Sequence, residues 1–130
     1  ATMKYSEDVF YTRDHEWVSG KSGTVRIGIS SYAVEQLGDI VHVDLPEKDS
    51  TLSGGDSLGT VESTKTVSDI YVPATGKVIE INSALESEPE KIMEDPYGSG
   101  WLVSIELSDS ITDGLMNSKE YQKYIEESES

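Results

Sequence analysis

The feature that most constrains this chain is an alternation of apolar and polar residues in short runs. The clearest runs cover residues 25–29, 41–45 and 101–107, and a shorter apolar run covers residues 77–81. A period of two residues is typical of a strand with one buried and one wet face. The pattern therefore predicts a mainly β chain built on antiparallel strands.

Turn-forming residues separate these runs and decide how the strands are joined. Glycine, proline, serine and aspartate gather at residues 19–23, 46–50, 53–56, 73–76 and 96–100. Short strands joined by such turns are typical of a sandwich or a flattened antiparallel β-barrel, which is the fold class we expect. The polar, glutamate-rich residues 82–95 are expected to form a solvated loop with room for one helical turn.

Two helices are expected to interrupt the strands. Ser30 or Ser31 can cap a short helix after the first strands, and Gly38 can end it in a left-handed conformation. Near the end of the chain, Tyr121 and Tyr124 follow one another at helical spacing. This spacing predicts a C-terminal amphipathic helix whose tyrosines pack onto the sheet.

Length and composition exclude several classes of function. The 130 residues fit one domain, spanning residues 1–130, because this is a usual size for a single core. Cysteine is absent, which excludes disulfides and thiolate chemistry by the chain itself and favours a reducing compartment. Ten lysines and arginines against 25 aspartates and glutamates give a net charge of −15. This charge disfavours nucleic acid and anionic membranes as partners and favours proteins with basic docking patches.

The most informative segment is residues 59–82, GTVESTKTVSDIYVPATGKVIEIN. Strands at residues 58–62 and 67–72 meet across residues 63–66, so Lys65 is predicted at the tip of a hairpin. An attachment point for a swinging arm needs an amine that a ligase can reach and that can sweep freely afterwards. Burial is unnecessary, because an activated acyl donor supplies the driving force. Taken alone, however, a lysine between two threonines is most simply a solvated charge.

Lys65 lies in ESTKTVSDIYVP, followed by GKVIEIN, and this segment resembles the lipoyl-lysine segment of the glycine cleavage system H protein family. The resemblance continues in the family's order through HEWV at 15–18, IGIS at 27–30, LGDIVHVDLP at 37–46, DPYGSGWL at 95–102 and KEY at 119–121. These blocks span nearly the whole chain. The resemblance implies the barrel-sandwich hybrid fold of lipoyl and biotinyl domains.

The resemblance also implies a carrier without a catalytic side chain of its own. In this family the lysine, here Lys65, holds lipoate in amide linkage. The carrier receives the aminomethyl group of glycine from a pyridoxal-phosphate decarboxylase and passes it to a tetrahydrofolate-dependent aminomethyltransferase. Dihydrolipoyl dehydrogenase then reoxidises the thiols. A lipoate ligase or lipoyl transferase is implied as the modifying enzyme. We further expect a monomer in a bacterial cytoplasm, or in the mitochondrial matrix of a eukaryote.

Three other residues, Glu16, Glu62 and Asp69, are candidates for contact with the arm or with its ligase. Family members hold the loaded arm in a cleft, and Glu16 and Asp69 match acidic residues near it that could pair with the ammonium group. Gln36 and Asp14 stand where some relatives have histidine and serine, respectively. Glu62 and Asp69 flank the hairpin, where ligase recognition and simple solvated edge charges are equally good interpretations.

Several alternatives stay open or are disfavoured by particular residues. Biotinyl domains typically have methionines beside the lysine, where this chain has Thr64 and Thr66. Lipoyl domains of 2-oxo acid dehydrogenases are shorter and lack the HEWV block and the C-terminal helix. An H-like relay or adaptor would have the same attachment segment and is not excluded. For an enzyme no recognisable catalytic arrangement occurs, and His15 and His42 lack metal-ligand spacing, so both are expected to be structural.

Overall fold

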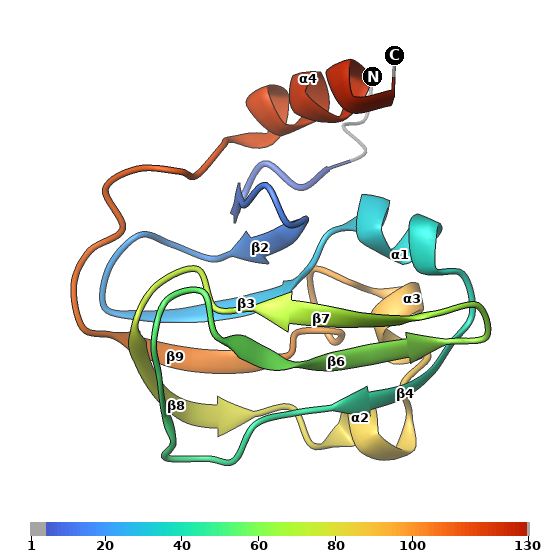
Figure 1. Ribbon diagram of the computed structural model, residues 1–130, viewed down its shortest axis with the longest axis horizontal. Coiled ribbons are helices and arrows are strands. Elements are labelled where there is room, and N and C mark those ends of the chain that lie inside the picture. The colour runs from blue at the N-terminus through green and yellow to red at the C-terminus, as the bar shows by residue number, and fades with distance from the viewer. Residues whose placement is uncertain (1–4, 130) are drawn as a thin grey trace.

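The computed structural model describes residues 5–129 and folds them into strands and short helices (Figure 1). The strands are β1 (Phe10–Tyr11), β2 (Glu16–Val18), β3 (Thr24–Ile29), β4 (Ile40–Asp44), β5 (Thr51–Leu52), β6 (Ser57–Ser63), β7 (Val67–Tyr71), β8 (Gly76–Ile81) and β9 (Val103–Leu107). The helices are α1 (Ser31–Leu37), α2 (Ala84–Ser87), α3 (Lys91–Glu94) and α4 (Ser118–Glu129). The expected short helix after the first strands and the expected C-terminal helix are both present.

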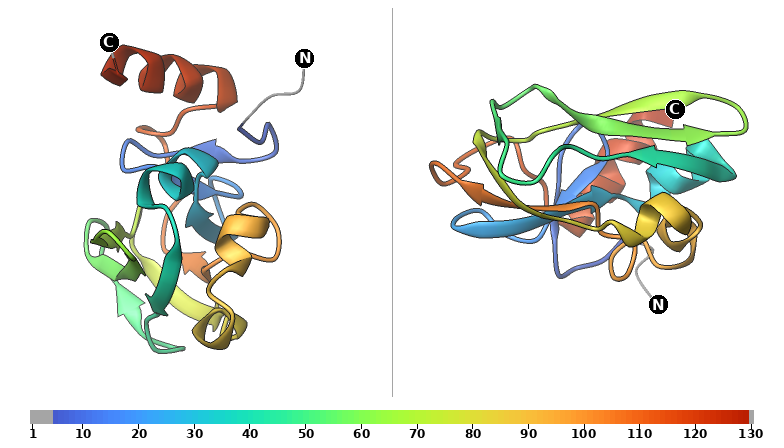
Figure 2. Two further views of the ribbon diagram at one scale, coloured as in Figure 1. Left: turned by 90° about the vertical axis from the view of Figure 1, so that its right-hand side faces the viewer. Right: turned by 90° about the horizontal axis from the view of Figure 1, so that it is seen from below.

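The strands form two antiparallel sheets that lie face to face. The larger sheet has the order β1-β2-β3-β9-β8-β5, and the smaller one has the order β4-β6-β7. Seen from below, the two sheets make two layers (Figure 2). Helix α4 lies over β1 and β2, on the outside of the sandwich (Figure 1). Within residues 5–129 the sheets do not close into a barrel. The expected mainly β, flattened barrel-sandwich fold is therefore confirmed.

The main core lies between the two sheets and follows the alternation of the sequence. In β3, Val25 and Ile27 are buried while their neighbours Thr24 and Arg26 are exposed. The smaller sheet contributes buried residues from each of its strands, among them Val43, Val61 and Ile70. Each such side chain removed from water contributes roughly 1.5–3 kcal/mol, so this core is the main source of stability.

A second, aromatic core lies under α4. It consists of Tyr5, Val9, Tyr11, Trp17, Tyr121 and Ile125. The rings of Tyr11 and Tyr121 stack with their centroids 4.2 Å apart. Tyr121 is completely buried, so α4 is joined to the sheet by packing, as its spacing predicted.

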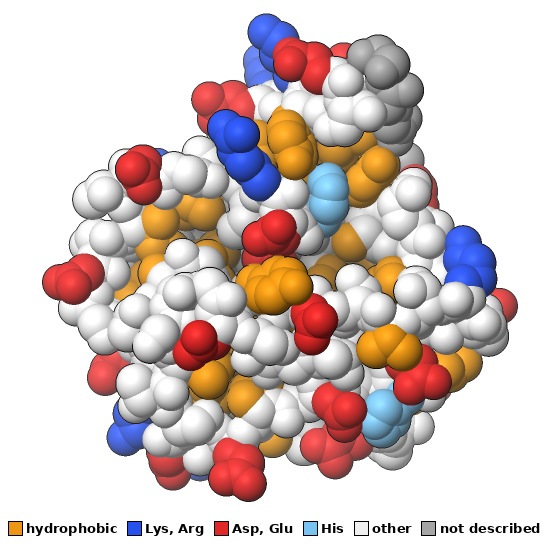
Figure 3. Space-filling view, viewed as in Figure 1, with side chains coloured by type: hydrophobic (Ala, Val, Ile, Leu, Met, Phe, Trp, Pro, Cys, Tyr) orange, Lys and Arg blue, Asp and Glu red, His pale blue; other side chains and the backbone are white. Residues whose placement is uncertain are grey.

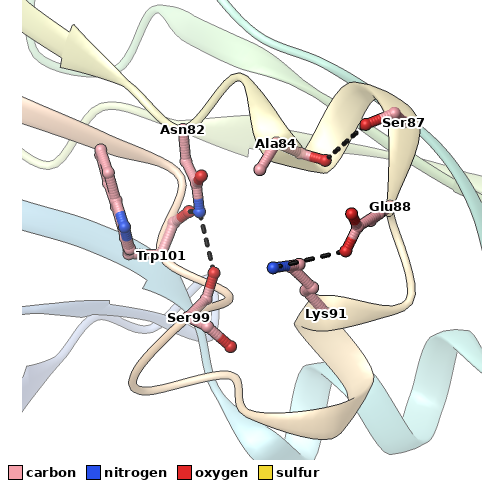
Figure 4. Close-up of polar contacts among 7 residues, drawn as sticks. All are labelled: Asn82, Ala84, Ser87, Glu88, Lys91, Ser99 and Trp101. Carbon is pink, nitrogen blue, oxygen red and sulfur yellow. Dashed lines mark hydrogen bonds and ion pairs between the residues drawn. The ribbon is translucent and has the colours of Figure 1, made fainter.

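Residues 82–95 differ from the expected solvated loop. They form α2 and α3, in which Leu85 and Ile92 are completely buried against the core. The Asn82 amide closes this segment by donating hydrogen bonds to the carbonyl oxygens of Ser99, at 2.9 Å, and Trp101, at 2.7 Å (Figure 4). Each of these four-residue helices buries one side chain, which is too weak a signal to reveal a helix from sequence.

Membrane-spanning helices were sought in the part of the chain that the structure describes. Within residues 5–129, every helix is too short or too polar to cross a bilayer.

Candidate functional site

Lys65 lies in the three-residue turn that joins β6 to β7, and its side chain is exposed. Thr64 and Thr66 on either side are exposed as well. The turn is one residue shorter than the four-residue loop expected from sequence, because Ser63 remains in β6 opposite Ile40 of β4. The sequence thus located the hairpin tip, and pairing with β4 decided where the strand ends.

Ser63, which the sequence did not single out, organises this turn from below. Its side chain is buried, and its hydroxyl oxygen accepts hydrogen bonds from the backbone N–H of Lys65 at 3.1 Å and of Thr66 at 3.2 Å. Its own N–H donates to the carbonyl oxygen of Thr66 at 2.8 Å, and Thr64 N–H donates to Asp39 at 3.0 Å. A serine just before a turn is the signal that could have found it. The backbone of the tip is therefore held firmly while the lysine amine stays in water.

Helix α1 ends beside the tip. Ser30 caps its N-terminus by accepting a hydrogen bond from Ala33 N–H at 3.1 Å, as expected. Gly38 ends it with φ 81°, a conformation that other residues rarely adopt. A Cβ atom at Gly38 would lie 3.2 Å from Cε of Lys65. The stem of Lys65 therefore passes across this glycine, next to the wall that α1 forms.

A groove of about 200 Å³ runs between α1 and β7, starting beside the lysine. Its floor is apolar and its walls carry polar and aromatic side chains. The lining residues are Asp14, His15, Ile29, Tyr32, Ala33, Gln36, Leu37, Thr66, Ser68, Asp69 and Ile70. On this face of the molecule, acidic side chains surround hollows with apolar floors (Figure 3). The groove thus begins at Thr66, next to the exposed amine of Lys65, and its lining includes the carboxylate residues Asp14 and Asp69.

The acidic residues expected near the site fall in different places. Asp69 is exposed on β7 and lines the groove, while its carboxylate also accepts a hydrogen bond from the Ser57 hydroxyl at 3.2 Å. Glu62 is exposed on β6, paired in register with Val67, and is not among the groove residues. Gln36 and Asp14 both line the groove. The structure therefore places Asp14 and Asp69 in the lining of one groove and Glu62 near the lysine on β6.

Glu16 is buried, with 1% of its surface exposed, and its carboxylate joins the two sheets. One oxygen accepts from the Thr12 hydroxyl at 3.0 Å, and the other accepts from Tyr71 N–H at 2.9 Å. Tyr71 ends β7, an edge strand of the smaller sheet, whereas Glu16 begins β2 of the larger one. Burial raises the pKa of Glu16 to about 7, and the two hydrogen bonds oppose that rise.

A second cavity, of about 480 Å³, has Tyr71 and Glu16 in its wall. Val72, Ile111 and Leu115 give it an apolar lining. Asp14 belongs to both cavities. The loop before β2 therefore separates the groove beside the lysine from this second hollow.

The two histidines have different environments. His15 lines the groove, and burial lowers its pKa. His42 is exposed on β4, with Nε2 3.1 Å from the Asp44 carboxylate. Across residues 5–129, no group of three or more histidines, cysteines, aspartates and glutamates is arranged to hold a metal ion.

These features define the class of protein. Two antiparallel sheets stacked as a flattened sandwich, with an exposed lysine at the tip of a hairpin, are the architecture of lipoyl- and biotinyl-type carrier domains.

Comparison with known proteins identifies the family within this class. Residues 9–128 match the model of the glycine cleavage H-protein family. The glycine cleavage system H protein of Listeria monocytogenes serotype 4a (strain HCC23) is 46% identical over 125 residues, covering 95% of this chain and 100% of the relative. That of Anaeromyxobacter sp. (strain K) is 45% identical over 128 residues, covering 98% and 100%.

A solved structure agrees. The crystal structure of a glycine cleavage system H protein from Mycobacterium marinum matches with a TM-score of 0.83 at 43% identity, covering 96% of this chain and 99% of that one. The chain therefore belongs to the glycine cleavage H-protein family, a family of carrier proteins.

Proposed function

We propose that this chain is the lipoate-bearing carrier of a glycine cleavage system, with lipoate in amide linkage on Lys65. The observation that carries the proposal is an exposed amine on a firmly held hairpin tip, beside a groove that leads away from it. A ligase can reach such an amine, and the same position lets an attached arm either swing outward or lie along the protein.

The residues around Lys65 fit lipoate. Bound lipoate supplies a dithiolane that accepts the aminomethyl group of glycine and the electrons of the reaction. Ile29, Leu37 and Ile70 give the groove an apolar floor suited to an aliphatic arm. Asp14 and Asp69 supply carboxylates on its walls, which can pair with an ammonium group and keep water away from a labile adduct.

Glu16 acts differently from Asp69 in this proposal. Both of its oxygens already accept hydrogen bonds, and the side chain is buried. We assign it the role of holding Tyr71 and Thr12, and so of keeping β7 and the loop before β2 in place along the groove. Asp14, which stands where some relatives have serine, then provides the second carboxylate that faces the arm.

The proposed partners are those that membership of the family implies. They are a pyridoxal-phosphate decarboxylase, a tetrahydrofolate-dependent aminomethyltransferase, dihydrolipoyl dehydrogenase and a lipoate ligase or lipoyl transferase. With a net charge of −15, the chain should bind basic patches on these enzymes, and binding should weaken as salt is added. Glu62 lies on the strand that leads to Lys65, which suits it for recognition by the ligase. The chain itself contributes no catalytic side chain.

Intact-mass measurement tests the attachment site. After coexpression with a lipoate ligase, the wild type and the control Lys77→Arg should each gain one lipoyl group, whereas Lys65→Arg should gain none. Lys77 is exposed on β8, which makes it a matched surface lysine. Peptide mapping should place the group on Lys65. A lipoyl group on another lysine would rule out the proposed site.

An exchange assay tests the place of the carrier in glycine cleavage. The lipoylated chain, mixed with the decarboxylase, should support exchange of labelled carbon dioxide into glycine, and the Lys65→Arg variant should not. If the lipoylated wild type failed to support exchange, the cleavage role would be excluded and a relay role would be the remaining interpretation.

A further inference from the structure

The ring of His15 contacts the C-terminal helix, α4. Its Nδ1 atom lies 2.8 Å from the hydroxyl oxygen of Tyr121 on α4, which is 106 residues away along the chain. The same hydroxyl lies 2.7 Å from Oγ of Ser30, the N-cap of α1. Tyr121 and Ser30 are both completely buried. The Tyr121 hydroxyl therefore contacts both the loop before β2 and the start of α1, the helix that forms one side of the groove.

The direction of these hydrogen bonds follows from the donors and acceptors present. Ser30 Oγ accepts the N–H of Ala33 at 3.1 Å, which fixes its role as the N-cap. A buried hydroxyl also needs an acceptor for its own proton, and among the described residues Tyr121 is the one within reach. Ser30 therefore donates to Tyr121. The proton of Tyr121 then has His15 Nδ1 as its acceptor.

This order of donors sets the tautomer of His15. If Nδ1 accepts, the neutral ring carries its proton on Nε2. Burial lowers the pKa of His15, which keeps the ring neutral near neutral pH. Nε2 makes no hydrogen bond to any residue between 5 and 129, and the ring lines the groove. An N–H donor is thus available beside Asp14 and Asp69, whose carboxylates are acceptors.

We propose that Tyr121 and Ser30 hold His15 as its Nε2–H tautomer, and that this N–H donates a hydrogen bond to an acceptor atom of the bound arm, its amide oxygen or a sulfur. The second half rests on the proposed function, because it needs lipoate on Lys65. The carboxylates and His15 then bind different groups of the arm. Asp14 and Asp69 pair with the ammonium group, and His15 binds an acceptor. Tyr121 is a positioning residue, so α4 determines the tautomer and orientation of His15 in the groove.

The tautomer is tested on the unmodified protein. Nitrogen-15 NMR of the histidine rings distinguishes a protonated Nε2 from a protonated Nδ1, and His42 serves as an internal reference. The wild type should show His15 with its proton on Nε2. Tyr121→Phe keeps the ring in the aromatic core but removes the hydroxyl, so His15 should lose its single tautomer. A proton on Nδ1 in the wild type, or an unchanged His15 signal in Tyr121→Phe, would overturn the proposal.

Tyr124→Phe is the matched control for that experiment. Tyr124 is on the same helix, and its hydroxyl donates to the carbonyl oxygen of Arg13 at 3.1 Å, not to His15. Its loss should leave the His15 signal where it is in the wild type. Because no lipoate is needed, failure of the tautomer test is independent of whether Lys65 is the attachment site.

The contact with the arm is tested on the lipoylated protein, after its mass has confirmed the modification. His15→Asn removes the imidazole and suits the backbone, since His15 has φ 68° and asparagine tolerates positive φ. Release of the aminomethyl group from the loaded arm into water should be about three- to tenfold faster than in the wild type. His42→Asn should leave the rate unchanged. If His15→Asn fails to fold, Tyr121→Phe replaces it and should also accelerate release. A wild-type release rate in the folded variant would refute the contact.

Discussion

Glu16→Gln tests the buried carboxylate that joins the two sheets. In the native protein its two oxygens face two donors, the Thr12 hydroxyl and Tyr71 N–H. The Thr12 oxygen also accepts the N–H groups of Asp14 and Glu16, so it cannot accept another proton readily. A glutamine amide satisfies one of the two donors, as a protonated Glu16 does. The variant is therefore a mimic of the neutral acid.

The magnitude follows from the change in the pKa of Glu16. Burial raises it from 4.5 to about 7, so between these values the folded protein binds more protons than the unfolded chain. This contribution to the free energy of unfolding is present below pH 4.5 and is lost as the pH rises through about 7. Between about pH 5 and about pH 8, the loss amounts to about 2.5 kcal/mol.

Urea unfolding followed by tryptophan fluorescence measures this effect, because Trp17 is buried in the neighbouring core. The quantity to compare is the free energy of unfolding of Glu16→Gln minus that of the wild type. It should favour the variant by about 0.8 kcal/mol at about pH 5, where the unfolded chain is already partly ionised, and by about 3.3 kcal/mol at about pH 8, a rise of about 2.5 kcal/mol. Taking the difference cancels the titration of the other carboxylates.

Glu62→Gln is the control, because it removes an exposed carboxylate from β6. It should change the free energy of unfolding by less than about 0.5 kcal/mol at every pH. A difference between Glu16→Gln and the wild type that stays flat from about pH 5 to about pH 8, or that favours the wild type more as pH rises, would refute the reasoning.

Three further substitutions test the packing around the site. Gly28→Ala should lower the free energy of unfolding by about 1–3 kcal/mol, because a Cβ there would lie 2.5 Å from ring atoms of Trp17. Thermal unfolding measures this loss, and an unchanged midpoint would contradict the close contact. Leu85→Ala should cost about 2–5 kcal/mol in urea unfolding, and a much smaller loss would mean that α2 is not part of the core. Gly38→Ala strains a residue at φ 81° and crowds Cε of Lys65, so a ligase should modify the variant more slowly than the wild type. An equal rate of modification would show that Gly38 leaves the lysine unaffected.

Much of the fold could be predicted from local sequence patterns. The alternation of apolar and polar residues identified most strands, and the segment around Lys65 located the hairpin tip. The alternation was wrong for Val41, which an irregular register between Ile40 and His42 leaves exposed. Ser30 or Ser31 was expected as an N-cap and Gly38 as a helix end; Ser30 is the N-cap, and Gly38 ends the helix. These features were predictable because a strand, a cap and a turn each depend on residues within a few positions of one another.

The arrangement around the groove depended on contacts between distant parts of the chain. Nothing in the residues next to Glu16 indicates that Tyr71, 55 positions away, donates to its carboxylate. Leu85 and Ile92 occupy a polar segment, and their burial is visible only once α2 and α3 cover the core.

His15 shows the division most clearly. The sequence by itself determined that it stands in the HEWV block without metal-ligand spacing, and no local pattern assigned it a partner. The tertiary structure decided that its ring lines the groove and meets Tyr121 of α4. The physical reason is that the alternation of a strand specifies which side is buried, whereas the tautomer and hydrogen bonds of a side chain depend on which distant element covers it.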